Sequence, residues 1–191
     1  MKTRVISGAV LLVVFGAACF FGGFFLWILL LAASLIGISE LSRALQSEKE
    51  KAGKKFTPLE LAAWALTAAY YILILVSFKE RTAFFLLMLS LILIIGVYVF
   101  LYPKYSSGYA MGMYFSVVYI GVCLSCVYLV RSGENGFHLV WLVFISSWIC
   151  DTGAYFVGCA LGKHKLAPVL SPKKTIEGSV GGVLCSAIIG G

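Results

Sequence analysis

One acidic residue, Asp151, lies inside a long apolar segment of this chain. It falls in the run from Phe137 to Val157, about six residues before the run ends, or about 9 Å along a helix. A carboxylate near the middle of a membrane costs at least about 2.5–3.5 kcal/mol, so it needs a compensating partner. On a helix, Ser147, Asp151 and Tyr155 share one face because they are four residues apart. This stripe predicts a residue that faces a polar cavity and binds a metal or a substrate. The alternative is a structural carboxylate bonded to a neighbouring helix.

Basic residues gather in the hydrophilic loop 158–179 that follows this run. They form two clusters, which are Lys163, His164 and Lys165, and then Lys173 and Lys174. Ser171 followed by Pro172 is typical of a helix start, with serine as the N-cap and proline in the first position. Lysines in that first turn oppose the helix dipole unless an anion binds there. The loop therefore predicts a phosphate site. The alternative is a loop that is basic because it faces the cytoplasm, with Lys173 paired to Glu177 four residues later.

The composition indicates which kind of fold holds these residues in place. The chain has 191 residues, of which 61% are apolar and 12% are charged, against about 25% charged in soluble domains. This excludes an ordinary soluble domain and a disordered chain, and at about 20 residues per crossing it predicts an all-α, polytopic transmembrane helical bundle. We expect about six full spans plus a truncated seventh. The expected spans are 5–21, 24–38, 61–78, 82–101, 111–129 and 137–157, with a partial span at 180–191.

The distribution of basic residues predicts the orientation. The formal net charge is +7, from 15 basic and 8 acidic residues. With a cytoplasmic N-terminus, twelve basic residues fall in inside segments and three in outside segments. We therefore expect a multi-pass cell-membrane protein whose N-terminus and loop 158–179 are cytoplasmic, and no nucleic-acid partner. The polar stretch 40–60 mixes charges of both signs and predicts an interfacial or solvated helix.

Three linked motifs carry a family resemblance. They read D-T-G-A-Y-F-x-G at 151–158, G-K-H-K-L-A-P at 162–168 and S-P-K-K-T-I-E-G-x-x-G-G at 171–182. Together they resemble the phosphatidate cytidylyltransferases, which are also called CDP-diacylglycerol synthases. The resemblance implies a membrane enzyme that condenses CTP with phosphatidic acid, requires Mg²⁺ and releases pyrophosphate. Membrane lipids are its other partners, and a homodimer is compatible with it. Residues 1–136 would then hold N-terminal transmembrane helices, and residues 137–191 would begin the catalytic region.

The resemblance also implies roles for individual residues. Lys173 and Lys174 are the expected catalytic contacts to the triphosphate or the lipid phosphate. Asp151 is expected to line the cavity and to bind a cation or cytidine. The other expected substrate-binding residues are Ser171, Thr175, Lys163, His164, Lys165 and Glu177. Among them, Glu177 is expected to orient a lysine. Gly178, Gly181 and Gly182 predict a close helix approach.

One part of the family pattern is missing. The family's C-terminal signature, which is rich in Lys-Asp and supplies paired acidic metal ligands, does not occur, and Glu177 is the only acidic residue after Asp151. A two-metal site cannot be built from these carboxylates. We therefore expect a truncated chain with little or no activity. The alternatives are a non-catalytic membrane remnant or scaffold, and a component of an ion or solute transporter that uses Asp151.

Overall fold

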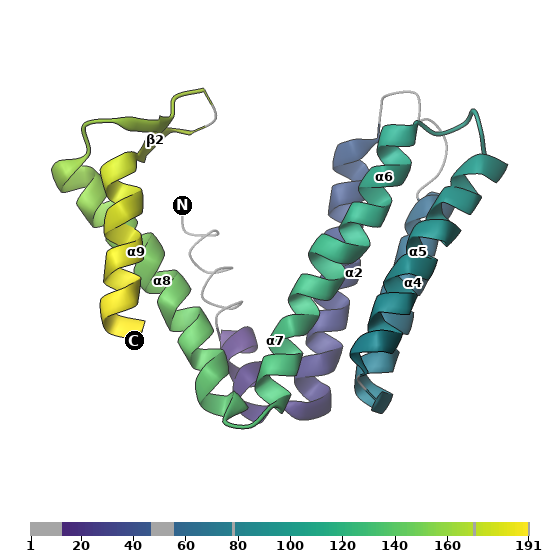
Figure 1. Cartoon of the computed structure of the whole chain (residues 1–191), viewed down its shortest axis with the longest axis horizontal. Helices are drawn as coiled ribbons and strands as arrows, with labels where there is room; N and C mark the ends of the chain where they lie inside the picture. Colours follow the sequence, from purple (N-terminus) through teal and green to yellow (C-terminus); the bar gives the residue numbers. More distant parts are fainter. Residues whose placement is uncertain (1–12, 47–55, 78, 170, 191) are drawn as a thin grey trace. The chain divides into compact units, whose positions relative to one another are not determined.

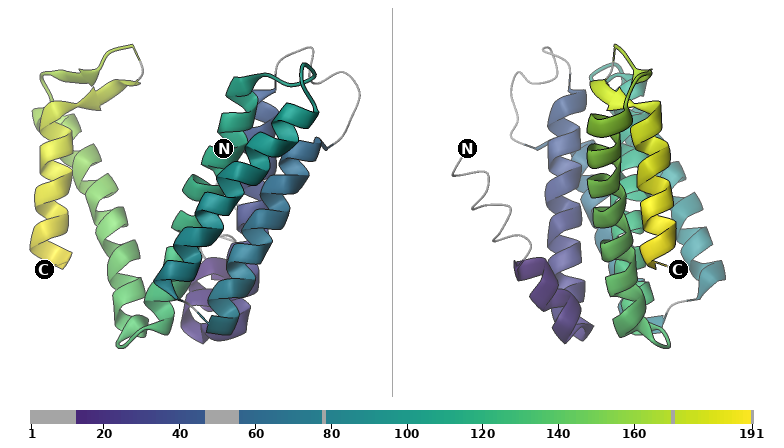
Figure 2. Two further views of the ribbon diagram at one scale, coloured as in Figure 1. Left: turned by 45° about the vertical axis from the view of Figure 1, so that its right-hand side comes forward. Right: turned by 90° about the vertical axis from the view of Figure 1, so that its left-hand side faces the viewer.

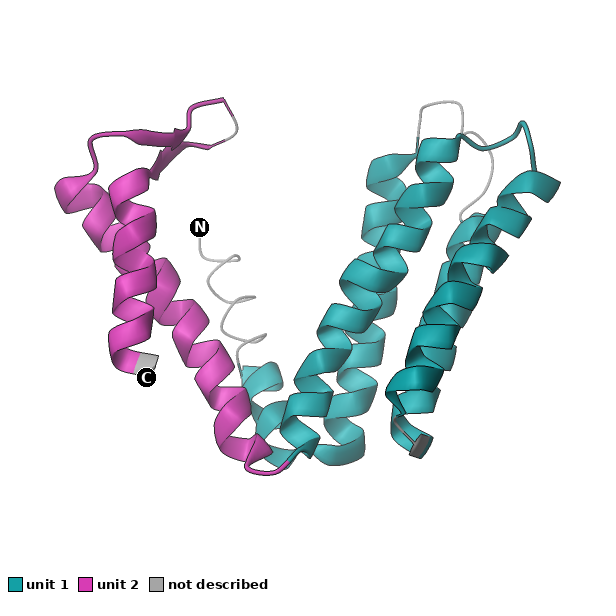
Figure 3. Cartoon of the chain, in the orientation of Figure 1, with its two compact units in different colours: residues 1–133 teal, residues 134–191 magenta. Residues whose placement is uncertain are grey.

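The chain folds into two compact units, residues 1–133 and residues 134–191 (Figure 3). The structure is a computed structural model, and it describes residues 13–46, 56–77, 79–169 and 171–190. Each unit has packing of its own.

Unit 1 consists of long apolar helices (Figure 1). Their bounds are α2 Gly23–Leu45, α4 Pro58–Ser77, α5 Glu80–Phe100, α6 Ser107–Ser116, the π-helical segment η1 Val117–Val122 and α7 Cys123–Ser132. The last three run on as one helical segment, Ser107–Ser132. Residues 13–21 are also helical, and Gly22, with a φ of +64°, turns the chain from them into α2. Glycine suits this turn because it adopts positive φ without a steric cost.

Unit 2 is a helical hairpin closed by two short strands (Figure 2). Its elements are α8 Gly136–Leu161, β1 Lys165–Ala167, β2 Ser171–Thr175 and α9 Ile176–Gly190. The two helices lie side by side, and the strands lie at the end where α8 stops and α9 starts.

The predicted fold class, an all-α polytopic bundle, is confirmed. Five helices of the described part are long and apolar enough to cross a membrane, namely Gly23–Leu45, Pro58–Val76, Glu80–Phe100, Ser107–Ser132 and Gly136–Leu161. They correspond to five of the six predicted full spans. Of the first predicted span, 5–21, residues 13–21 are helical, and residues 5–12 lie outside the described part. The predicted partial span corresponds to α9, which has 15 residues.

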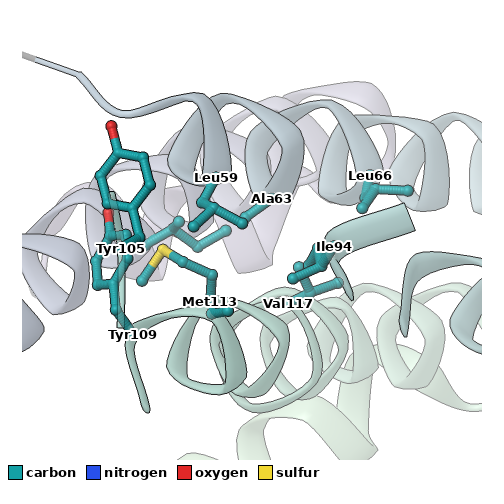
Figure 4. Packing of buried hydrophobic residues seen from close by; sticks show 10 residues of the cluster. Leu59, Ala63, Leu66, Ile94, Tyr105, Tyr109, Met113 and Val117 are labelled. Atoms are coloured by element: carbon teal, nitrogen blue, oxygen red, sulfur yellow. The ribbon is translucent and has the colours of Figure 1, made fainter. Parts of the chain in front are cut away.

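Apolar side chains from four helical segments form a buried cluster in unit 1 (Figure 4). Its members include Ile38 of α2, Leu59, Ala63 and Leu66 of α4, Ile94 of α5, and Tyr109, Met113 and Val117 of α6 and η1. Dispersion contacts of this kind hold helices together in lipid, where the surrounding chains are as apolar as the core.

A buried polar cluster joins the ends of α2, α4 and α6. Glu60 is only 2% exposed, and one of its carboxylate oxygens accepts a hydrogen bond from Ser42 Oγ at 3.0 Å. Tyr109 Oη lies 2.8 Å from Ser42 Oγ and 2.7 Å from Thr57 Oγ1. The prediction of an interfacial or solvated helix over 40–60 is therefore wrong at Glu60, whereas residues 40–45 are helical and four of these six residues are exposed. Residues 40–45 continue α2, and Glu60 lies inside α4, while residues 47–55 lie outside the described part.

Candidate functional site

Small residues let α8 and α9 pack closely. A Cβ atom on Gly182 would lie 2.5 Å from the carbonyl oxygen of Cys150, and a Cβ atom on Gly178 would lie 2.7 Å from that of Ala154. Gly181 is equally close to a side chain of α8. The predicted close approach at these glycines is confirmed, because any side chain there would push the helices apart. This packing fixes the end of α8 against the start of α9, where the basic clusters lie.

The two strands form an antiparallel ladder across the basic clusters. Lys165 pairs with Thr175 and Ala167 pairs with Ser171, with an irregularity between the two pairs. At the end of the ladder the backbone N–H of Ile176 donates to the carbonyl oxygen of His164 at 3.0 Å. The segment 163–165 is therefore held beside the first turn of α9.

The predicted helix start at Ser171 and Pro172 is wrong. Residues 171–175 form β2, and α9 begins at Ile176. Thr175 acts as the cap in place of serine, since its Oγ1 accepts a hydrogen bond from the backbone N–H of Gly178 at 3.2 Å. Lys173 and Lys174 therefore lie in a strand and not in the first turn of a helix, so the dipole argument for a phosphate there does not apply.

Glu177 joins the first basic cluster to α9. Its Oε2 accepts hydrogen bonds from the backbone N–H groups of Lys163 at 3.1 Å and of His164 at 3.2 Å. Its Oε1 lies 2.6 Å from Nδ1 of His164. The alternative pairing of Glu177 with Lys173 is not found among the described residues, because Lys173 belongs to a strand.

These contacts lower the pKa of Glu177. The largest cause is the hydrogen bond from His164, helped by backbone N–H donors, and the pKa falls to about 2. Glu177 lies at the loop end of α9, outside the five candidate spans. The carboxylate is therefore ionised at neutral pH and can only accept hydrogen bonds, so Nδ1 of His164 must donate.

A pH titration tests this contact. Because the folded pKa lies below the ordinary value of about 4.3, the contact stabilises the fold fully above that value, and its contribution is lost as the pH falls through about 2. We expect the Glu177 carboxyl signal of ¹³C-labelled protein in micelles to titrate near pH 2. In His164→Ala the midpoint should move up toward the ordinary value. A midpoint near 4.3 in the unmodified protein would contradict the contact.

The expected phosphate-binding lysines are exposed, and no acidic side chain of the described residues pairs with them. These four residues are Lys163, Lys165, Lys173 and Lys174. Within the described ranges the ion pairs are Arg43–Glu40 and His164–Glu177, and neither includes these lysines. Ser171 is partly buried and Thr175 is buried. The strands and the His164 segment thus concentrate positive charge at one end of unit 2, and this charge suits an anion.

Asp151 lies in the second half of α8. It is exposed within unit 2 and stands ten residues before α8 ends at Leu161, about 15 Å along the axis. The predicted depth of about 9 Å counts from the end of the apolar run at Val157 and stays a prediction, while the helix continues for four more residues. Ser147 and Tyr155 are exposed as well, so the predicted stripe lies on an exposed face of α8. Among the described contacts, none joins Asp151 to the basic clusters.

The described residues do not by themselves complete a metal site. No group of three or more His, Cys, Asp or Glu side chains within them is placed to hold one. Asp151 belongs to no such group among the described residues, and both oxygens of Glu177 already accept hydrogen bonds from His164 or from backbone donors. Mg²⁺ is usually held by one or two carboxylates together with substrate phosphates and water, so Asp151 alone would supply only part of its ligands.

Three features of the structure were missed in the sequence. The Glu177–His164 contact joins residues 13 apart, and no helical spacing predicts it. The burial of Glu60 was also missed. The third feature, the α8 side of the close helix contact, could have been predicted. Cys150, Ala154 and Gly158 are small residues spaced four apart, which is the pattern of a close helix contact.

Comparison with known proteins identifies a family that the chain matches. Residues 2–191 match the cytidylyltransferase family. Proteins called phosphatidate cytidylyltransferase from Staphylococcus saprophyticus, Staphylococcus haemolyticus and Staphylococcus aureus (strain COL) are 46%, 49% and 49% identical to the chain over 74 residues. The matched segment is 39% of this chain and 28% of each relative, so it spans less than a third of the curated proteins it matches.

Proposed function

The chain belongs to the cytidylyltransferase family, and we propose that it takes part in the transfer of a cytidylyl group from CTP to phosphatidic acid. In this reaction a phosphate oxygen of phosphatidic acid attacks the α-phosphorus of CTP. The bond from that phosphorus to the bridging oxygen breaks, and pyrophosphate leaves. The products are CDP-diacylglycerol and pyrophosphate. The observation that carries the proposal is the family match over residues 2–191. It favours the enzyme over a transporter component or a scaffold.

The basic clusters support this reaction at the level of charge. The substrates bring a triphosphate and a lipid phosphate together, and their negative charges repel each other. Lys173 and Lys174, both exposed in β2, would bind phosphoryl oxygens and offset that repulsion. Lys163 and Lys165 would add secondary contacts, and Ser171 and Thr175 would hold the strand in place.

The membrane placement follows from the helices and the charges. The chain is a multi-pass membrane protein with five described candidate spans. We place it in the cell membrane with its N-terminus and loop 158–179 in the cytoplasm, because basic residues favour that side and CTP is found there. That the protein forms a homodimer and that its reaction requires Mg²⁺ also remain predictions. Asp151 is the candidate metal ligand, and no step of the reaction is derived through the ion.

Incorporation of labelled CTP tests the proposal. Membranes from a bacterial host that expresses the complete gene product should incorporate [³H]CTP into chloroform-soluble lipid when phosphatidic acid is added, and release pyrophosphate in equal amount. Host membranes without the gene give the background rate. The same background rate from expressing membranes, with the protein shown to be present and folded, would contradict the proposal.

A further inference from the structure

The carboxylate of Glu177 holds a whole segment and not a single side chain. It accepts hydrogen bonds from the backbone N–H groups of Lys163 and His164 at 3.1 and 3.2 Å, and from Nδ1 of the His164 imidazole at 2.6 Å. All of these donors come from one short segment, and the acceptor belongs to the first turn of α9. The carbonyl oxygen of His164 is held as well, by the backbone N–H of Ile176. The position of the His164 backbone and the rotation of its ring are therefore both fixed by α9.

This arrangement leaves one ring nitrogen for a ligand. The ionised carboxylate only accepts, so Nδ1 carries the proton between the two groups. Among the described residues no hydrogen bond involves Nε2. The His164 side chain as a whole is 75% exposed, while that of Glu177 is 28% exposed. An exposed nitrogen between two lysines is well placed to meet an anion.

We propose that Glu177 is a positioning residue, which orients His164 so that Nε2 donates a hydrogen bond to a phosphoryl oxygen of a substrate. The proposal rests on the proposed function and replaces the expectation that Glu177 orients a lysine. Because Nδ1 already donates to Glu177, a ring whose Nε2 also donates carries both protons. The imidazolium formed in the complex then adds a positive charge to those of Lys163 and Lys165.

Direct contact between Glu177 and a phosphoryl group is the competing role. Its negative charge would repel a phosphate, and both of its oxygens already accept hydrogen bonds. A contact through a metal ion is not supported, since the described residues around it do not form a metal-binding group. The carboxylate therefore acts through His164.

Hydrogen exchange measures the positioning role without an activity assay. In Glu177→Gln the side chain keeps its size but loses its charge, so amide exchange in the segment 162–168 should become about tenfold faster, as expected for the loss of a charge-assisted hydrogen bond. Glu40→Gln is the matched control, because Glu40 also sits in an exposed ion pair, with Arg43 at 3.0 Å. It should leave this segment unchanged. Equal exchange rates of the segment in Glu177→Gln and in the unmodified protein would overturn the proposal.

The substitution His164→Asn separates holding from binding. An asparagine amide lies where Nδ1 was and can still donate to Glu177, but it has nothing at the position of Nε2. Exchange in 162–168 should therefore stay within about twofold of the unmodified protein, while KM for one substrate rises about tenfold at nearly constant kcat. A rise in KM for CTP assigns the contact to the nucleotide, and a rise in KM for phosphatidic acid assigns it to the lipid.

The matched control for this variant is His138→Asn, which changes the other histidine of the chain and should leave both KM values unchanged. Unchanged KM values in His164→Asn would overturn the contact through Nε2. If the unmodified protein incorporates no CTP, the proposed function fails, and the exchange comparison still decides whether Glu177 positions the segment.

Discussion

Replacing both Lys173 and Lys174 by alanine is expected to reduce CDP-diacylglycerol synthesis by the complete gene product at least about 100-fold. A hydrogen bond from a charged group contributes about 1.5–3 kcal/mol, so two such contacts to phosphoryl oxygens correspond to two or more powers of ten. Both side chains are exposed in β2, and no carboxylate in the described part of the chain pairs with them. Their charges are therefore available to a substrate. The measurement is the initial rate of lipid labelling from [³H]CTP at several concentrations of both substrates.

A control on the same predicted side of the membrane makes this result specific. Lys104 is exposed in the turn after α5, and Lys104→Ala removes one positive charge from unit 1, against two in the double alanine variant. It should change the rate by less than about twofold, because an exposed lysine that binds no phosphoryl oxygen contributes little. Replacing Lys173 and Lys174 by arginine should restore part of the activity, since the charge and the hydrogen-bond donors remain. Equal losses in Lys104→Ala and in the double alanine variant would show that general basicity matters and that no dedicated site exists.

The spans were predictable because hydropathy reports directly on the membrane. Each described candidate span overlaps one of the predicted apolar runs. The helix ends were not predictable from it, because a helix does not stop where the membrane does. The run 24–38 ends well before α2, which continues to Leu45. The additional turns carry Ser42, whose hydroxyl bonds to Glu60 of α4. The contact that favours these turns is distant in sequence, so a local pattern does not reveal it.

The local structure of the basic loop was predicted incorrectly for a related reason. Serine followed by proline is typical of a helix start, but a residue before proline also favours an extended backbone. What decides between the two is the pairing of β2 with β1, which depends on the folding back of the chain between them. Thr175 offers an equally good cap four residues later, and the close approach of Gly178 to Ala154 fixes α9 in that position.

The residue types of the candidate site were readable, while their mutual contacts were not. Clustered lysines predict an anion site whatever their secondary structure. The alternative pairing of Glu177 with Lys173 depended on a spacing of four residues, which brings two side chains into contact only on a helix. With Lys173 in a strand that contact is lost, and Glu177 meets His164. The placement of Asp151 relative to these lysines stays a prediction, because no described contact joins them.

The second large effect is expected from a single methyl group between α8 and α9. In Gly182→Ala the new Cβ would lie 2.5 Å from the carbonyl oxygen of Cys150 and 2.9 Å from Cβ of Ala154. Neither neighbour can move freely, because one is backbone and the other is fixed to it. The helices must separate, and overpacking of this kind costs about 1–3 kcal/mol. The unfolding free energy in mixed micelles, followed by circular dichroism, should fall by this amount.

The same substitution at an open position isolates the packing effect. Gly96 lies in α5, and nothing is found within 4 Å of the position that its Cβ would occupy. Gly96→Ala adds the same methyl group and should leave the stability unchanged or raise it by up to about 1 kcal/mol, because alanine favours a helix more than glycine does. Separation of α8 and α9 also displaces Thr175 and Glu177 from the end of α8, so Gly182→Ala should speed amide exchange in 162–168 while Gly96→Ala does not. Equal stabilities of the two variants would show that the glycines of α9 are not needed for close packing against α8. The argument that this helix pair positions the basic segments would then fail.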